Sequence, residues 1–317
     1  MNLTLLKKIE GARRGILATI IKTEGHTYKK KGEKALYEVD DPLPVCGNIG
    51  AGCVDQEILT RGKEAFARRK PVIVRIDTSD PSDIVFGYGT FCGGVIEVLL
   101  EPVFREQKKI YRELMDYLEK TEDIPRKEPV YLIHDPKTGA IRLSRESPRP
   151  FEGIFIEEIH PPENLYIFGA TPLAQQVIKC LDEMDFRIHL VDWRASYLAK
   201  FENVDHIRLH EEFVGFDESS MVLVLSHHFE RDRDVLKRAL IKGCTYVGLL
   251  SSETRRDRIF EELKKEGISE SMLERVSSPV GLDINSKSDA EIAVSIVAQL
   301  VRFKNHSLDR TRRSREE

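Results

Sequence analysis

One segment of this 317-residue chain constrains the fold more than any other. It begins with the apolar run 164–168 and a turn at Gly169, continues as an amphipathic helix, and ends with a second apolar run that closes on Asp192. A strand, a glycine turn, a helix and a strand ending in an acid are typical of the first unit of a dinucleotide-binding fold.

The same alternation continues along the chain. Apolar runs predict strands near 165–168, 187–191, 205–209, 221–225 and 245–250, with helices between most of them. The last long helix is expected to begin at a capping box formed by Ser288 and Glu291. The predicted fold class is α/β, with an N-terminal α/β domain that carries glycine-cysteine loops and a C-terminal Rossmann-like, doubly wound parallel sheet.

The length exceeds the usual size of one hydrophobic core, so two domains are expected. We place the N-terminal domain at 1–125, a hairpin and linker at 126–160, the Rossmann-like domain at 161–303, and a polar, disordered tail at 304–317.

The composition, 41% hydrophobic and 32% charged residues, is that of a soluble globular protein. A net charge of -4 argues against a general nucleic-acid-binding function. No apolar run reaches the roughly eighteen residues of a membrane span, and the first residues lack the pattern of a secretory signal. We therefore expect a cytoplasmic protein that binds neither nucleic acid nor membrane.

The five cysteines are an odd number and lack the close, repeated pairs of a zinc site or a disulfide framework, so reduced thiols are expected. Cys180 and Cys244 fall in or beside apolar elements, where a thiol acts as a small hydrophobic group. The segment 26–34 holds four lysines around Gly32 and is interpreted first as a solvated loop, with contact to an anionic ligand as the alternative.

Two glycine-rich loops carry the cysteines with the best functional setting. In the first, Gly47, Gly50 and Gly52 precede Cys53, which is expected at the N-terminus of a helix. Free N–H groups and the helix dipole there attract phosphate and lower the pKa of a thiol, while a tight turn that needs glycine only for its geometry is an equal alternative. In the second loop Cys92 lies directly before a strand, and two cysteines in similar settings favour a functional role.

The glycine turn departs from the usual dinucleotide fingerprint. Its three positions are Gly169, Thr171 and Ala174, so a branched side chain stands where a diphosphate would come nearest, and Pro172 lacks an N–H donor. Asp192 is well placed for a ribose hydroxyl but can equally cap the following turn. Binding of NAD(P) through Gly169 and Asp192 is therefore disfavoured and kept as an alternative.

A polar cluster follows the predicted strand 221–225. His227 and Asp232 are expected at the carboxyl end of the sheet, where open parallel sheets bind their ligands. Both are candidates for proton transfer or for holding a metal. In the alternative that the residues alone favour, Asp232 helps to begin the next helix and the histidines are solvated.

Several segments together resemble the XdhC/CoxI family, accessory factors of xanthine dehydrogenase and related molybdenum hydroxylases. The resemblance covers both domains and is carried by the segments 47–55, 92–97 with Glu101-Pro102, 246–250, 279–284 and 291–296.

The resemblance implies a cytoplasmic protein that binds the molybdenum cofactor and assists its sulfuration and insertion into an apo-hydroxylase. It implies Cys53 and Cys92 as ligands of the cofactor and its metal, and His227 and Asp232 as catalytic candidates. We also expect a homo-oligomer and a cysteine desulfurase as a further partner. Soft thiolates suit the metal, and a glycine-rich helix start suits the phosphate of this anionic pterin.

Departures from the family pattern fall in the C-terminal domain, at Thr171, His228 and Ser251.

Two other function classes compete with the chaperone. One is an NAD(P)-dependent oxidoreductase that acts on a small molecule, and the other is a scaffolding protein in which neither Cys53 nor Cys92 acts.

Overall fold

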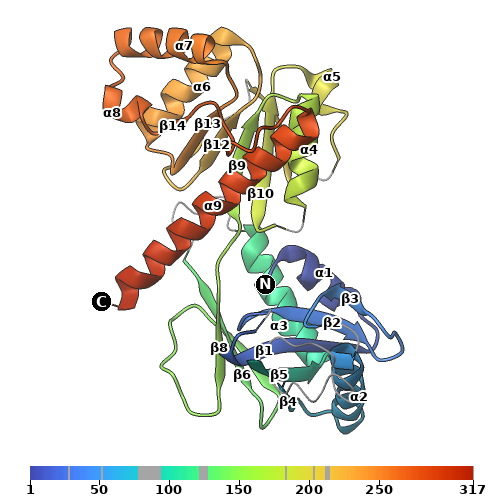
Figure 1. Cartoon of the computed structure of the whole chain (residues 1–317). Helices are drawn as coiled ribbons and strands as arrows, with labels where there is room; N and C mark the ends of the chain where they lie inside the picture. Colours follow the sequence, from blue (N-terminus) through green and yellow to red (C-terminus); the bar gives the residue numbers. More distant parts are fainter. Residues whose placement is uncertain are drawn as a thin grey trace. The chain divides into compact units, whose positions relative to one another are not determined.

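The structure is a computed structural model that describes residues 1–27, 29–50, 53–77, 94–120, 128–182, 184–202, 204–210 and 215–316, without the side chains of residues 53 and 307–316. The chain divides into two compact units, one that ends at Pro161 and one that begins at Pro162 (Figure 1). We call them the N-terminal unit and the C-terminal unit.

The N-terminal unit contains an antiparallel sheet with the strand order β3-β2-β1-β5-β4. Its strands are β1 (Gly15–Gly25), β2 (Lys34–Glu38), β3 (Pro44–Gly47), β4 (Val72–Asp77) and β5 (Gly94–Pro102). Helix α2 (Cys53–Arg68) packs on one face, and α1 (Leu3–Gly11) and α3 (Arg105–Lys120) pack on the other. Because β1 is covered on both faces, its first six residues are all buried, which explains the continuous apolar run in the sequence.

A second sheet in this unit has the order β7-β6-β8, formed by β6 (Val130–Asp135), β7 (Ala140–Ser144) and β8 (Phe155–Ile159). The predicted hairpin is confirmed, since β6 pairs with β7 antiparallel. Strand β8 pairs with the other edge of β6. Apolar residues of β6 and β8 join the core formed by α1 and α3.

The C-terminal unit contains a six-stranded sheet with the order β11-β10-β9-β12-β13-β14, and its neighbouring strands pair in parallel. The strands are β9 (Glu163–Phe168), β10 (Phe186–Asp192), β11 (His206–Leu209), β12 (Met221–Val224), β13 (Tyr246–Leu249) and β14 (Val276–Ser277). The predicted Rossmann-like sheet is confirmed. The short edge strand β14 was not predicted, because two residues carry no periodicity.

Helices cover both faces of this sheet (Figure 1). On one face α4 (Pro172–Leu181), α5 (Ala195–Leu198) and α9 (Asp289–Glu316) share a core with the strands. On the other face the core includes α6 (Phe229–Lys242), α7 (Glu253–Lys265) and α8 (Glu270–Leu273). This two-sided cover makes the sheet doubly wound.

The predicted capping box opens α9. The Ser288 N–H donates to Glu291 Oε2 over 2.9 Å, and the Glu291 N–H donates to Ser288 Oγ over 3.3 Å. The helix continues past Phe303 to Glu316, so it includes most of the segment that we expect to be disordered. The disorder of 304–317 in solution stays a prediction.

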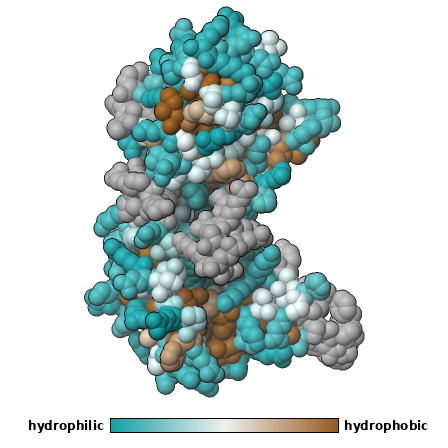
Figure 2. Space-filling view, turned by 90° about the vertical axis from the view of Figure 1, so that its left-hand side faces the viewer, coloured by the Kyte–Doolittle hydropathy of each residue, from teal (hydrophilic) through white to brown (hydrophobic). Residues whose placement is uncertain are grey.

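Within the described residues, no helix is both long enough and apolar enough to cross a membrane. The face drawn in Figure 2 is mainly hydrophilic and carries small, separate hydrophobic patches. Scattered patches of this kind are normal on a folded protein surface.

Candidate functional site

The first glycine-cysteine loop is shaped by close backbone packing. Gly47 has φ +75°, and a Cβ there would collide with the Lys34 carbonyl oxygen. A Cβ on Gly50 would collide with the side chain of Val54 in the first turn of α2. Geometry alone thus accounts for glycine at both positions, and a ligand-binding role for them stays a prediction.

A buried hydrogen bond holds the start of α2, the helix that begins at Cys53 as predicted. The Tyr37 hydroxyl donates to Asp55 Oδ1 over 2.6 Å, and both side chains are buried. Burial and the neighbouring carboxylate raise the pKa of Tyr37 far above its usual value, so the phenol stays protonated and remains a donor. The core of the unit therefore fixes the position of the backbone at Cys53.

Gly52, Cys92 and the side chain of Cys53, for which functional roles are predicted, lie outside the described residues. The roles of Cys53 and Cys92 as ligands of a cofactor and its metal therefore stay predictions. Among the described cysteines, Cys244 is buried in the core as predicted, and burial raises the pKa of its thiol to about 12. A thiol so hard to ionise is a poor nucleophile and a poor metal ligand.

A buried cluster of charged groups in the N-terminal unit was not anticipated from the residue pattern. Lys34 Nζ lies 2.8 Å from Glu157 Oε2 and donates to Thr19 Oγ1 over 3.0 Å. His134 Nδ1 lies 2.9 Å from Glu101 Oε1, and its Nε2 lies 3.9 Å from Glu157 Oε2. The prediction of a solvated loop is therefore wrong at Lys34, which begins β2 and is 7% exposed.

This cluster joins the two sheets of the unit. Lys34 and Glu101 belong to the five-stranded sheet, and His134 and Glu157 belong to the three-stranded one. Burial by itself opposes ionisation of Glu157, but Lys34 and the chain's amino terminus outweigh it and lower the pKa of this carboxyl. Glu157 is therefore ionised at neutral pH and needs its cationic partners.

The C-terminal unit has a narrow crevice where ligands of open parallel sheets usually bind. Strand β9 lies between β10 and β12, so the strand order reverses beside it. The crevice opens at the carboxyl ends of these three strands and is lined by Phe168, Gly169, Val191, Trp193, His210, Ser226, Arg231, Asp232 and Val235. This position is the topological switch point of the sheet.

The glycine turn at the crevice satisfies its own hydrogen bonds. The Ala170 N–H donates to Asp192 Oδ2 over 2.7 Å, and Thr171 Oγ1 caps α4 by accepting from the Ala174 N–H. A Cβ on Gly169 would lie 2.6 Å from the Cα of Ser226, so the glycine permits close packing on the segment after β12. The usual N–H donor of a diphosphate-binding turn is thus engaged by a side chain.

Asp192 also binds the residue that follows it in the next turn. Its Oδ1 accepts from the N–H and the Nε of Arg194 over 2.8 and 2.9 Å, and its Oδ2 accepts from Nη2 over 2.8 Å. Burial raises the pKa of Asp192, but these hydrogen bonds and that from Ala170 outweigh it, and the pKa is lowered. Both carboxylate oxygens of Asp192 thus accept hydrogen bonds, as expected if this residue caps the following turn. A ribose contact through Asp192 stays a prediction.

His227 and Asp232 lie together at the carboxyl end of β12, as predicted. Asp232 is 1% exposed, accepts from Ser226 Oγ, and accepts from Arg255 Nη2 over 2.7 Å. Burial raises the pKa of Asp232, and these two partners offset the effect only in part. His227 has φ +57°, a rare conformation for a residue with a side chain. Helix α6 begins at Phe229, with His228 as its cap.

Among the described residues, His227 and Asp232 are not part of a group of side chains that could hold a metal ion. In the part of the chain that the structure describes, no group of three or more His, Cys, Asp or Glu residues is arranged to hold a metal ion. The predicted metal ligands Cys53 and Cys92 are not covered by this statement, and their role stays a prediction.

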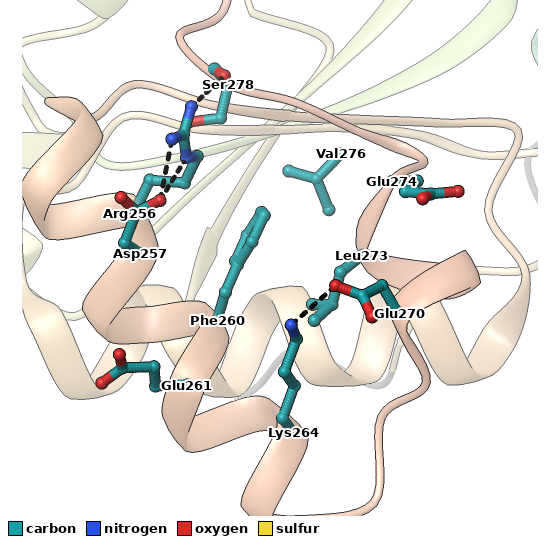
Figure 3. Close-up of a pocket in the computed structure, with 10 residues that line it drawn as sticks. All are labelled: Arg256, Asp257, Phe260, Glu261, Lys264, Glu270, Leu273, Glu274, Val276 and Ser278. Atoms are coloured by element: carbon teal, nitrogen blue, oxygen red, sulfur yellow. Dashed lines mark hydrogen bonds and ion pairs between the residues drawn. The ribbon is translucent and has the colours of Figure 1, made fainter.

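A second groove lies between α7, α8 and β14 (Figure 3). Its apolar floor consists of Phe260, Leu273 and Val276. Charges at its rim pair with each other: Lys264 Nζ lies 2.8 Å from Glu270, and Arg256 lies 2.7 Å from Asp257 (Figure 3). Lys264 and Arg256, two cations at the rim of the groove, are therefore paired with carboxylates of the groove itself.

Comparison with known proteins places this geometry in a family. A family model described as the XdhC Rossmann domain matches residues 165–300, and one described as the XdhC and CoxI family matches residues 9–77. Together the two ranges span more than half of the chain. The chain belongs to the XdhC/CoxI family. The resemblance inferred from the sequence is therefore confirmed.

Relatives of this XdhC/CoxI protein match almost its whole length. A Bacillus subtilis (strain 168) protein, described as a probable xanthine dehydrogenase subunit, is 25% identical over 323 residues, which cover 93% of this chain and 95% of the relative. The molybdenum cofactor insertion chaperone PaoD of Escherichia coli (strain K12) is 22% identical over 295 residues, 92% of this chain and 84% of PaoD. A crystal structure described as a xanthine dehydrogenase from Bacillus halodurans has a TM-score of 0.80 at 27% identity and covers 96% of each chain.

Proposed function

We propose that this XdhC/CoxI protein binds the molybdenum cofactor and assists its sulfuration and its insertion into a xanthine dehydrogenase-type hydroxylase. The observation that carries the proposal is the match to PaoD, a molybdenum cofactor insertion chaperone, over 92% of the chain. The match to a probable subunit of a xanthine dehydrogenase over a similar length supports a hydroxylase as the client.

The local chemistry of the N-terminal unit fits this cargo. The first turn of a helix offers unpaired N–H groups to a phosphate. Helix α2 begins at Cys53, and the segment before it carries no side chain at Gly47 or Gly50. Thiolates of Cys53 and Cys92 are the soft ligands that the cofactor's metal and sulfur prefer. The Tyr37–Asp55 hydrogen bond keeps the start of α2 in place while cargo enters and leaves.

The C-terminal unit supplies the candidates for proton transfer. Asp232 has a raised pKa and lies beside His227, and carboxyl and imidazole groups are the side chains that most often transfer protons in proteins. We assign this pair to protonation steps during cofactor transfer. The rate of transfer measured against pH tests the role, since a purely structural Asp232 would leave the profile of an Asp232→Asn variant unchanged in shape.

Partners follow from the same proposal. In this proposal the apo-hydroxylase would receive the cofactor, a cysteine desulfurase would supply the sulfur for its sulfuration, and the chaperone would act as a homo-oligomer. Mixing purified chaperone, desulfurase and apo-hydroxylase tests the set. Hydroxylase activation that does not depend on the chaperone would contradict it.

Loss of the two loop cysteines is expected to lower cofactor retention at least about tenfold, the scale of losing ligands at a metal site. The protein is purified from cells that make the cofactor, and bound pterin and molybdenum are measured for the wild type and for Cys53→Ala/Cys92→Ala. Cys180→Ala/Cys244→Ala is the matched control, because these thiols pack in or against the core of the C-terminal unit. Equal retention in all three proteins would sink the proposal.

A further inference from the structure

The groove between α7, α8 and β14 carries an excess of negative charge. Six charged side chains line it, of which two are cations and four are carboxylates: Arg256, Lys264, Asp257, Glu261, Glu270 and Glu274. All of them except Arg256 are exposed. The carboxylates outnumber the cations by two at neutral pH, so the rim of the groove attracts a cationic partner.

Two of these carboxylates, Glu261 and Glu274, make no ion pair with any described residue, and Figure 3 draws no interaction at either of them. The Glu270 carboxylate contributes most to the raised pKa of Lys264, and Glu261 adds only a weaker effect through space. Arg275 does not neutralise Glu274, because its Nη2 donates to two backbone carbonyls after α6. The excess negative charge is therefore divided between α7 and the end of α8.

An aromatic ring lies between the charged pairs of the groove. Arg256, Phe260 and Lys264 are spaced four residues apart on α7, so they follow one face of this helix. The Phe260 ring is partly exposed, packs against the core that contains Leu273 and Val276, and points from α7 into the groove (Figure 3). An apolar surface with a polar, charged rim is the usual anatomy of a protein-binding site.

Contacts across the groove fix its shape. Arg256 Nη1 donates to the Ser278 carbonyl over 3.3 Å and connects α7 to the segment after β14. Lys264 Nζ donates to Glu270 Oε1 over 2.8 Å and connects α7 to the start of α8. The groove has a volume of about 560 Å³, which lies within the range of about 300–1,000 Å³ that is usual for preformed binding clefts. A preformed cleft binds its partner without first having to be ordered.

We propose that this groove docks a segment of a partner protein in which lysines or arginines flank one bulky apolar side chain. The apolar side chain covers Phe260, and the flanking cations lie against Glu261 and Glu274. Carboxylates on two different helices require at least two cations on one ligand, which a peptide segment supplies and a small amine does not. The inference goes beyond the proposed function, because it concerns partner binding by the C-terminal unit and does not depend on Cys53 or Cys92.

Selection of phage-displayed random dodecapeptides on the purified full-length protein tests the groove. The selected peptides are expected to be rich in lysine and arginine around one leucine, isoleucine or phenylalanine. Fluorescence anisotropy with a labelled copy of the enriched peptide gives the affinity. Glu261→Lys/Glu274→Lys is expected to weaken binding at least about tenfold, because like charges then oppose the peptide. Replacing the apolar residue of the peptide by serine is expected to weaken binding by a similar factor.

Asp182→Lys/Glu202→Lys is the matched control. It makes the same charge change at exposed positions after α4 and α5, which cover the other face of the sheet, and is expected to leave the affinity unchanged. Both double variants are expected to keep the circular dichroism and the thermal midpoint of the wild type, because all four substituted side chains are exposed. The Cys53→Ala/Cys92→Ala protein is expected to bind the peptide like the wild type, which separates this inference from the proposed function.

Three results would overturn the inference. One is a set of selected peptides without a bias toward basic residues. Another is equal affinity of the peptide for the wild type and for Glu261→Lys/Glu274→Lys. The third is self-association of the wild type in sedimentation velocity that only Glu261→Lys/Glu274→Lys abolishes, since the groove would then be occupied by a second copy of this chain.

Discussion

Replacing Lys34 by methionine is expected to lower the free energy of unfolding by about 3–5 kcal/mol, because it leaves Glu157 ionised and buried without its ammonium partner. The side chains of Lys34 and Glu157 are only 4% and 9% exposed, so water cannot replace the lost contact. Thr19 Oγ1 loses its donor in the same variant. Urea denaturation gives the energy, and hydrogen exchange of β2 and β8 amides shows whether the loss is located in the N-terminal unit.

Two further variants show whether the loss of stability comes from the buried ion pair of Lys34 and Glu157. Lys30→Met changes an exposed lysine in the segment before β2 and is expected to alter stability by less than about 0.5 kcal/mol. Lys34→Met/Glu157→Leu removes both members of the buried pair and is expected to recover most of the loss. A Lys34→Met protein as stable as the wild type would show that the ion pair contributes nothing to the stability of the fold.

The same pair makes the N-terminal unit sensitive to acid. Burial opposes ionisation of Glu157, but Lys34 and the amino terminus lower its pKa below the usual value of a glutamate, so the unfolded chain binds more protons than the folded one at moderately acid pH. The stabilisation from Glu157 is complete above the unfolded pKa and is lost as the pH falls through the folded pKa. Unfolding free energies measured between pH 6 and roughly pH 3 should fall more steeply for the wild type than for Lys34→Met/Glu157→Leu.

The C-terminal sheet was predictable because parallel strands buried on both faces form continuous apolar runs. Strand β10, for example, is buried at all seven positions. Strand β2 was not predicted, because its segment of the sequence does not form such a continuous apolar run. It begins with Lys34 beside three other lysines, and the acid that permits its burial, Glu157, lies in a strand of another sheet. A local pattern does not reveal a partner that the fold brings from far along the chain.

The candidate site was predictable in position more than in detail. A strand followed by a polar cluster placed His227 and Asp232 just after β12, as the structure has them, since that rule depends only on the sheet, and their roles stay predictions. The use of Asp192 was open from the sequence, because a ribose contact and a cap for the next turn require the same residue at the same place.

Gly169→Ala tests the close packing of the turn at the centre of the C-terminal unit, and we expect it to lower the free energy of unfolding by about 2–5 kcal/mol. Two effects combine. Gly169 has φ +111°, where a residue with a side chain loses at least about 1–2 kcal/mol, and overpacking adds about 1–3 kcal/mol. The new Cβ would meet Ser226 Cα at 2.6 Å and Ser226 N at 2.7 Å, which are backbone atoms that cannot rotate away.

Gly243→Ala is the matched control, because Gly243 also has a positive φ, +75°, but no atom lies within 4 Å of the Cβ position. It isolates the backbone cost and is expected to lose only about 1–2 kcal/mol. The pair of variants separates the two reasons for a glycine in a dinucleotide-type turn. If Gly169 serves close packing, Gly169→Ala is the less stable variant. If it serves the approach of a ligand, both variants are similarly stable.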